Sequence, residues 1–234
     1  MEGLLLVDKP AGWTSFDVVK YVRGVVAKAE NLPSKKVKVG HSGTLDPFAT
    51  GLLIILIGKS FTTKAESLLK MDKTYFVKME LGKISSSGDP EGELSLSNPG
   101  NIRPDQEQLD SVFKTLSGKT ISQVPPAFSA IKVNGVRAYK LARNKVEVKL
   151  EPRNVTIYSL KLLKYEFPLL EFEAVVSSGT YIRSLVEDIG KDLGTGAYTT
   201  SLRRTSIGSY SISAAVQIAN LNEQTISSML RSQS

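Results

Sequence analysis

The 234-residue sequence contains no cysteine and only one histidine, His41. Without cysteine there is no disulfide framework and no thiolate-bound metal, and one histidine cannot build a multi-histidine zinc centre. The lack of cysteine also favours a reducing compartment. We therefore expect no resident metal.

Long apolar runs are also missing. No stretch approaches the roughly 18 consecutive apolar residues of a membrane-spanning helix, and the N-terminal run Leu4-Leu5-Leu6-Val7 is too short, and lacks the basic flank, for a signal peptide. We expect a soluble, cytoplasmic and monomeric protein with no membrane partner.

Acidic residues are outnumbered by basic ones. The 30 lysines and arginines against 23 aspartates and glutamates give a net charge of +7 and a pI near 9.4, which favours a polyanionic partner such as a nucleic acid. The hydrophobic content of 41% is enough for a sizeable core. One large domain, with or without an insertion, is the expected organisation.

Hydrophobic periodicity predicts the order of the elements. The predicted strands cover residues 4–7, 52–57, 73–81, 154–166, 169–177, 202–204 and 207–212. The predicted helices cover residues 15–28, 60–69, 104–116 and 181–193. We expect a long surface loop over residues 82–101 and a frayed tail from Asn222.

The stretch from Gly40 to Gly51 joins a glycine-containing loop to the apolar run at residues 52–57. Its glycines allow unusual backbone angles, and Pro47 forces Asp46 out of the helical region. The apolar run is typical of a strand buried on both faces. A carboxylate on a stiff loop beside a buried strand is a suitable platform for chemistry.

Several familiar sites are excluded by spacing. Gly58-Lys59-Ser60 resembles the end of a phosphate-binding loop, but the preceding glycine is seven residues away instead of five. His41 and Ser42 are neighbours on extended backbone and point apart, so they form no hydrolase pair. No dinucleotide fingerprint follows a strand.

Acidic residues alternate in the predicted loop at Asp89, Glu91 and Glu93. They could attract Mg²⁺, but carboxylates spaced in this way along a glycine-containing loop are more typically solvated.

Basic residues gather in two segments. The first covers residues 28–38, with Lys28, Lys35, Lys36 and Lys38, and is either a functional surface or a solvated loop. The second, residues 127–149, carries aromatic residues among its basic ones: Phe128, Lys132, Arg137, Tyr139, Lys140, Arg143, Lys145 and Lys149. If residues 137–143 are helical, one face suits phosphates and an unpaired base; a solvated amphipathic helix is the alternative.

Arg183 lies near the start of the last predicted helix, where an arginine gains nothing from the helix dipole. It either binds a specific anion or is an ordinary surface residue.

Together these segments resemble a known family, the TruB-type tRNA pseudouridine synthases. Residues 40–51 are similar to the catalytic loop of that family, and its other signatures follow in the same order over residues 3–219. They are Leu5-Leu6-Val7-Asp8-Lys9-Pro10-Ala11-Gly12-Trp13-Thr14-Ser15, Lys73-Thr74-Tyr75, Val124-Pro125-Pro126, Ser129-Ala130-Ile131-Lys132 and Gly179-Thr180-Tyr181-Ile182-Arg183-Ser184-Leu185.

The resemblance implies an isomerase that converts uridine 55 in the T loop of tRNA to pseudouridine, with no cofactor. Asp46 would be the nucleophile, and Arg183 would pair with it. Tyr75 would stack on the flipped uracil and is a candidate for proton transfer. His41 would help to fill the vacated space, while Tyr181 and Leu202 would line the pocket. Attack at C6 of the uracil and attack at C1′ of the ribose both remain open.

The implied fold is α+β: a mixed, mainly antiparallel central sheet flanked by helices, with an RNA-gripping insertion. The catalytic domain would cover residues 1–220, with the insertion at about 124–152 and a tail at 221–234. Four residues of the insertion would contact RNA phosphates: Lys132, Arg137, Lys140 and Arg143.

The sequence departs from the family pattern in places. Ser85-Ser86-Ser87 replaces an expected Thr-Asp-Thr, and Phe128 replaces a tyrosine. We also expect the C-terminal PUA-type domain of many relatives to be missing. The alternatives to the T-loop enzyme are an RNA-binding or tRNA-folding module and the same chemistry on another RNA.

Overall fold

The computed structural model describes residues 1–97, 100–129, 131–133, 135–144, 146 and 148–231. Ala130 and Lys145, which belong to predicted motifs, lie outside the described residues. Two compact units make up the chain: Met1–Thr74 with Arg203–Ser234, and Tyr75–Leu202. Strands β4 (Lys73–Leu81) and β12 (Ala197–Ile207) contribute residues to both units.

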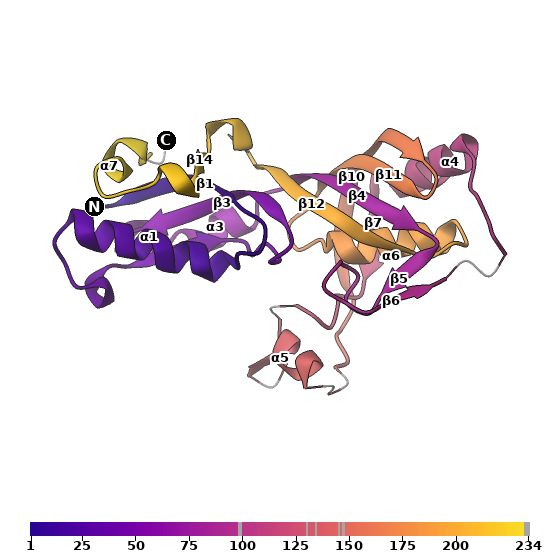
Figure 1. Ribbon diagram of the computed structural model, residues 1–234, viewed down its shortest axis with the longest axis horizontal. Coiled ribbons are helices and arrows are strands. Elements are labelled where there is room, and N and C mark those ends of the chain that lie inside the picture. Colours follow the sequence, from indigo (N-terminus) through magenta and orange to yellow (C-terminus); the bar gives the residue numbers. More distant parts are fainter. Residues whose placement is uncertain (98–99, 130, 134, 145, 147, 232–234) are drawn as a thin grey trace. The chain divides into compact units, whose positions relative to one another are not determined.

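The first unit is built on a sheet with the strand order β14-β1-β3-β12, to which β2 and β13 add (Figure 1). β1 runs antiparallel to β3, whereas β14 is parallel to β1, and the end of β12 is parallel to β3. Its strands are β1 (Gly3–Lys9), β2 (Val39–Ser42), β3 (Thr50–Ile57), β13 (Tyr210–Ser211) and β14 (Val216–Gln217). Its helices are α1 (Ser15–Ala29), η1 (Ser34–Lys36), α2 (Lys59–Thr62), α3 (Ala65–Leu69), η2 (Ile212–Ala214), η3 (Ile218–Asn220) and α7 (Ile226–Met229).

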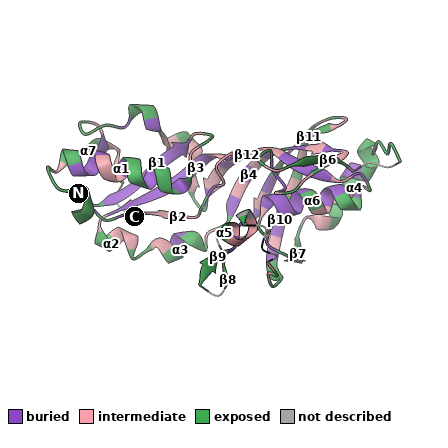
Figure 2. Ribbon diagram, turned by 60° about the horizontal axis from the view of Figure 1, so that its bottom comes forward, coloured by how far each residue is buried: buried purple, intermediate pink, exposed green. Residues whose placement is uncertain are grey.

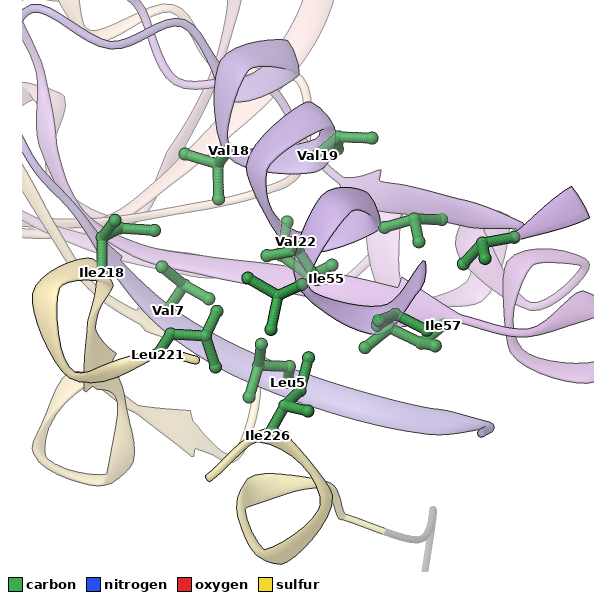
Figure 3. Packing of buried hydrophobic residues seen from close by; sticks show 14 of the residues in the cluster. Leu5, Val7, Val18, Val19, Val22, Ile55, Ile57, Ile218, Leu221 and Ile226 are labelled. Atoms are coloured by element: carbon green, nitrogen blue, oxygen red, sulfur yellow. The ribbon is translucent and has the colours of Figure 1, made fainter. Parts of the chain in front are cut away.

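Helix α1 confirms the amphipathic helix predicted over residues 15–28. Thr14 forms a capping box with Asp17, which fixes the first turn. Val18 and Val22 point from α1 toward Leu5 of β1 and Ile55 of β3 (Figure 3). Because valines have a modest helix propensity, this burial rather than intrinsic preference stabilises α1.

Strand β3 is buried on both faces, as predicted. Leu53, Ile55 and Ile57 pack in the cluster under α1, whereas Leu52 and Ile54 pack in a second cluster with Leu68 of α3. This double burial makes β3 the central support of the first unit.

The described part of the C-terminal segment, residues 222–231, packs on the first unit, so the prediction of fraying from Asn222 is wrong for these residues. Helix α7 places Ile226, 0% exposed, in the cluster under α1 (Figure 3). Arg231 forms a two-way backbone bridge with Leu4. The polar residues between the buried positions hide the apolar pattern in the sequence.

The second unit has a sheet with the order β12-β4-β11-β10-β7. Its further strands are β5 (Lys83–Ser85), β6 (Leu94–Leu96), β7 (Lys119–Gln123), β8 (Lys132–Val133), β9 (Val136–Arg137), β10 (Arg153–Glu166) and β11 (Leu169–Val176). Its helices are α4 (Gln106–Leu116), α5 (Ala138–Arg143) and α6 (Ile182–Asp192).

One face of this sheet is apolar, as the alternating patterns predicted. Val77 and Met79 of β4 and Phe172 of β11 are fully buried, and Phe172 meets Phe113 of α4 edge to face at a ring distance of 5.3 Å. Figure 2 shows the inward sides of α6, β4 and β11 as buried. The fold is thus the predicted mixed, mainly antiparallel sheet with flanking helices.

Four boundaries differ from the prediction. The helix expected over residues 60–69 is two short ones, α2 and α3, and Pro104 precedes the capping residue Asp105 instead of lying in the first turn of α4. The loop expected over residues 82–101 contains the β5–β6 hairpin. The strand expected over residues 207–212 is broken at Gly208, whose positive φ reverses the chain.

The described helices include none that is long and apolar enough to cross a membrane.

Candidate functional site

The loop that carries Asp46 joins β2 to β3 in the first unit. Asp46 is half-buried, and Pro47 follows it directly. The Asp46 carbonyl accepts a hydrogen bond from Ala49 N at 3.1 Å, which closes a tight turn. The backbone is fixed while the carboxylate remains partly accessible.

Arg204 holds both ends of this loop. The side chain, 1% exposed, donates from Nε to the Leu52 carbonyl at 2.8 Å and from its terminal nitrogens to the carbonyls of Gly43 at 3.1 Å and Thr44 at 3.5 Å. A buried guanidinium is costly unless its donors are used, and here they bind the loop's own backbone.

Lys9 secures the middle of the loop. Its buried ammonium donates to the carbonyls of Pro10 at 2.9 Å, Trp13 at 2.6 Å and Pro47 at 3.2 Å. Gly12 N also donates to the Pro47 carbonyl, at 2.8 Å. The residue that follows Asp46 is therefore tied to the turn after β1.

Ser15 fixes the residue on the other side of Asp46. Leu45 N donates to the Ser15 hydroxyl at 2.8 Å, and that hydroxyl lies 3.2 Å from the Leu45 carbonyl. Asp46 is thus flanked by two anchored residues, so its carboxylate is presented from a rigid loop, as the sequence predicted.

His41 and Ser42 take opposite sides of β2. Ser42 is fully buried and His41 is half-buried, while their strand neighbours are Ile54 and Ile55 of β3. This alternation agrees with the exclusion of a histidine–serine hydrolase pair.

Lys73 is a third buried cation of the first unit. Its ammonium donates to the carbonyls of Leu69, at 2.6 Å, and Met71. Burial, assisted by the nearby charge of Arg204, lowers its pKa to about 8. The proximity of the two cations accounts for part of this shift.

In the second unit, Arg183 is buried at the start of α6. It is 3% exposed, which rules out the ordinary surface arginine. Its guanidinium donates to the carbonyls of Ser87 at 2.7 Å and Phe128 at 2.8 Å, and it lies 3.3 Å from a carboxylate oxygen of Asp89. It thus has an anionic partner within its own unit.

Asp89 is a functional candidate that the sequence reasoning missed. It is 4% exposed, so the expectation that it is solvated is wrong, while Glu91 and Glu93 are exposed as expected. Its carboxylate accepts hydrogen bonds from the Ser87 hydroxyl at 2.6 Å and Glu91 N at 3.0 Å. The signal available in the sequence was the adjacent Ser-Gly-Asp turn.

Gln123 is a second missed residue. Its buried amide accepts a hydrogen bond from Tyr181 N at 2.8 Å and donates to the Tyr181 carbonyl at 3.1 Å. Ser184 donates to the Val124 carbonyl at 3.2 Å. The start of α6 therefore fixes the chain where the insertion begins.

The remaining pocket candidates lie on the second unit. Tyr75 of β4 and Leu202 of β12 are buried, whereas Tyr181, which precedes the first residue of α6, is half-buried. Asp46 and His41 belong to the first unit, so their approach to Tyr75 and Arg183 stays a prediction.

The insertion carries its basic residues around α5. Lys132 of β8, Arg137 before α5 and Lys140 are exposed, and Arg143 is the last residue of α5. Tyr139 N donates to the Ser129 carbonyl at 3.0 Å, which ties α5 to the segment after Phe128. Contact of these residues with RNA stays a prediction.

No group of three or more potential metal ligands occurs in the part of the chain that the structure describes.

Comparison with known families gives two matches that are adjacent in the sequence. The description "TruB family pseudouridylate synthase (N terminal domain)" matches residues 31–182, and "tRNA pseudouridylate synthase B C-terminal domain" matches residues 183–232. The similarity thus continues beyond the residue 219 expected from the motifs.

Similar proteins include several called tRNA pseudouridine synthase B. The protein from Clostridium acetobutylicum is 41% identical over 97% of this chain and 74% of its own length. The proteins from Protochlamydia amoebophila and Parabacteroides distasonis are 40% and 43% identical over 96% and 88% of this chain, and 81% and 85% of their own lengths.

Solved structures show the same fold. A chain of an H/ACA RNP bound to a substrate RNA containing 2′-deoxyuridine matches with a TM-score of 0.65 and 27% identity, and one of a Cbf5-Nop10-Gar1 complex with 0.66 and 29%. Each match covers 94% of this chain but 52% and 53% of the solved chain, so this chain spans about half their length. The sequence and fold matches agree, and the chain belongs to the TruB family of pseudouridylate synthases, which are isomerases.

Proposed function

We propose that the protein isomerises uridine 55 in the T loop of tRNA to pseudouridine, with Asp46 as the nucleophile. The observation that carries the proposal is the presentation of Asp46, whose neighbours Leu45 and Pro47 are both anchored by hydrogen bonds. The name shared by the bacterial relatives, tRNA pseudouridine synthase B, supports tRNA as the substrate.

The reaction breaks the glycosidic bond between N1 of uracil and C1′ of ribose and forms a bond between C5 and C1′. C5 loses a proton and N1 gains one, so substrate and product are isomers and no cofactor is consumed. An ionised carboxylate can begin this exchange by adding to C6 or to C1′. Holding that carboxylate in place removes part of the entropic barrier.

The other candidate residues have defined tasks. The uracil leaves its base stack and stacks on the Tyr75 ring, while His41 helps to occupy the space that the base vacates. Arg183 supplies the counter-charge that keeps Asp46 ionised, and its partner Asp89 fixes the guanidinium in place. Tyr181 and Leu202 line the pocket.

The insertion grips the RNA backbone. Lys132, Arg137, Lys140 and Arg143 contact phosphates without reading the sequence, so they contribute affinity and orientation. We place this activity in the cytoplasm, with the protein acting as a monomer.

The test is to assay the Asp46→Asn variant of the protein for pseudouridine formation in a T-stem-loop transcript. We expect pseudouridine formation to fall below detection while most RNA binding remains, because the amide keeps the shape of the carboxylate but is not nucleophilic. Asp72→Asn, an exposed carboxylate of the same unit, is the matched control and should leave the rate unchanged. Full activity of Asp46→Asn would refute the mechanism.

The alternative, an RNA-binding or tRNA-folding module, predicts a different result. In that case the wild-type protein would bind the transcript but leave its uridines unchanged. Mapping pseudouridines in cells with and without the protein distinguishes tRNA from another RNA as the substrate.

A further inference from the structure

The turn that carries Asp89 connects β5 to β6 and contains the run Ser85-Ser86-Ser87. The function proposed above gives tasks to Asp89 and to its partner Arg183, but none to these serines. The serines, Asp89 and Arg183 all belong to the second unit, so the contacts among them lie within one unit.

Ser87 binds both partners of the ion pair between Arg183 and Asp89. Its carbonyl oxygen accepts a hydrogen bond from Nη1 of Arg183 at 2.7 Å, and its hydroxyl donates to Oδ1 of Asp89 at 2.6 Å. The same Nη1 lies 3.3 Å from Oδ2 of Asp89. Ser87 therefore fixes the guanidinium and the carboxylate relative to each other.

The Ser87 hydroxyl orients a carboxylate that is out of contact with bulk water. Asp89 and Arg183 are both buried, and Oδ1 of Asp89 also accepts a hydrogen bond from Glu91 N at 3.0 Å. Hydrogen bonds to a charged acceptor are strong, and a buried carboxylate that loses one turns toward another donor. Because Nη1 of Arg183 lies against this carboxylate, the guanidinium moves with it.

Other contacts hold the backbone of the turn. Thr199 N donates to the Gly88 carbonyl at 3.0 Å, and the Ser85 hydroxyl donates to the Asp89 carbonyl at 2.6 Å. Gly88 also lies against Glu187 of α6, since a Cβ added to the glycine would be 2.5 Å from a carboxylate oxygen of that residue. Loss of the serine hydroxyl that binds Oδ1 should therefore change side-chain orientation and leave the path of the chain intact.

We infer that Ser87 is a positioning residue, whose hydroxyl orients the Asp89 carboxylate and, through it, the guanidinium of Arg183. The inference rests on the proposed function, because this orientation affects the reaction only where Arg183 is the counter-charge of Asp46. Misplacement of an active-site group by about 1 Å costs up to about 100-fold in rate. The Phe128 carbonyl still holds the other terminal nitrogen of Arg183, so a smaller loss is expected.

Three variants test the inference. Ser87→Ala removes the hydroxyl, whereas Ser87→Thr keeps it and introduces the residue expected at this position from the family pattern. Ser86→Ala is the matched control, because Ser86 is exposed in the same turn and its hydroxyl accepts a hydrogen bond from Glu93 N at 2.9 Å. Each variant is assayed on a T-stem-loop transcript for the single-turnover rate at saturating RNA and for RNA affinity, and its stability is measured in urea.

We expect Ser87→Ala to lower the rate about tenfold and to change the RNA affinity less than about twofold. Ser87→Thr should restore the rate to within about threefold of the wild type, and Ser86→Ala should leave it unchanged. A purely structural role would lower the stability of Ser87→Ala in urea while the folded variant kept the wild-type rate. That result would overturn the inference, as would equal losses of rate in Ser87→Ala and Ser87→Thr.

Nuclear magnetic resonance separates this inference from the proposed function. In ¹⁵N-labelled protein without RNA, the guanidinium signals of Arg183, assigned with Arg183→Lys, report how firmly the group is held and protected from hydrogen exchange. We expect this protection to fall in Ser87→Ala and to persist in Ser86→Ala. If the wild-type protein forms no pseudouridine but the protection still falls, the positioning role stands and the proposed function fails. Unchanged protection in Ser87→Ala would overturn the inference.

Discussion

The guanidinium of Arg204 donates a hydrogen bond to the carbonyl oxygen of Gly43 at 3.1 Å. The same side chain binds the Leu52 carbonyl at 2.8 Å, on the far side of Asp46 in the sequence. One buried side chain thus sets the separation of the two ends of the Asp46 loop. The position of the proposed nucleophile depends on it.

The first prediction concerns Arg204→Lys. A lysine keeps the charge but cannot reach three carbonyls in a planar arrangement, so Asp46 should shift. We expect the single-turnover rate of pseudouridine formation to fall about 100-fold, with RNA affinity changed less than about threefold. Rates measured on protein shown to be folded by circular dichroism test this.

A purely structural role for Arg204 gives another outcome. Arg204→Lys would then lower stability in urea, while the folded protein kept the wild-type rate. Thr205→Ser, at a half-buried neighbouring position in β12, is the control and should retain both stability and rate.

The second prediction concerns Gly51→Ala, at the strand position paired with Arg204. Gly51 has a φ of +104°, and an added Cβ would lie 2.3 Å from the Arg204 carbonyl oxygen, so β3 and β12 would have to separate. We expect a loss of about 3 kcal/mol or more in urea unfolding.

Gly12→Ala is the matched control. Gly12 has a φ of +77° but no atom within 4 Å of an added Cβ. The only cost of Gly12→Ala is therefore that of holding alanine at a positive φ, about 1 kcal/mol. Equal losses for the two variants would mean that the close approach of β3 and β12 at Gly51 is not needed.

Periodicity predicted the elements whose burial is one-sided or complete. The spacing of apolar residues along the chain follows directly from the local backbone geometry. It predicted α1 from its valines, β3 from its continuous apolar run and β4 from its alternation. The rigid loop at Asp46 was predicted for the same reason, since glycine and proline act on their own backbone.

What the sequence could not show are the contacts between distant segments. Arg204 follows the Asp46 loop by more than 150 residues, and Gln123 and Tyr181 meet across 58 residues. Asp89 seemed solvated because its burial depends on Arg183 of α6. Such pairs leave no local pattern.

The third prediction uses the pKa of Lys73, which burial and Arg204 lower to about 8. The folded protein then releases this proton near pH 8, whereas the unfolded chain keeps it to about pH 10.5. Between these values the unfolded state binds more protons, so Lys73 contributes stability that increases as pH rises.

Replacing Lys73 by methionine should remove this dependence. We expect the difference in unfolding free energy between wild type and Lys73→Met, measured in urea from pH 7 to 10, to shift in favour of the wild type as pH increases. Lys70→Met, an exposed lysine paired with Glu66, is the control and should show no such trend below pH 10. A pH-independent difference for Lys73→Met would contradict the pKa.

The last prediction concerns the C-terminal segment, which the sequence suggested to be frayed. Ile226 of α7 is 0% exposed and packs among the residues under α1 (Figure 3), so Ile226→Ala should leave a cavity and cost about 3 kcal/mol in urea unfolding. Ser227→Ala, an exposed neighbour on the same short helix, should change stability by less than about 0.5 kcal/mol. If α7 did not pack on the first unit, both substitutions would be equally neutral, because no buried apolar surface would be lost.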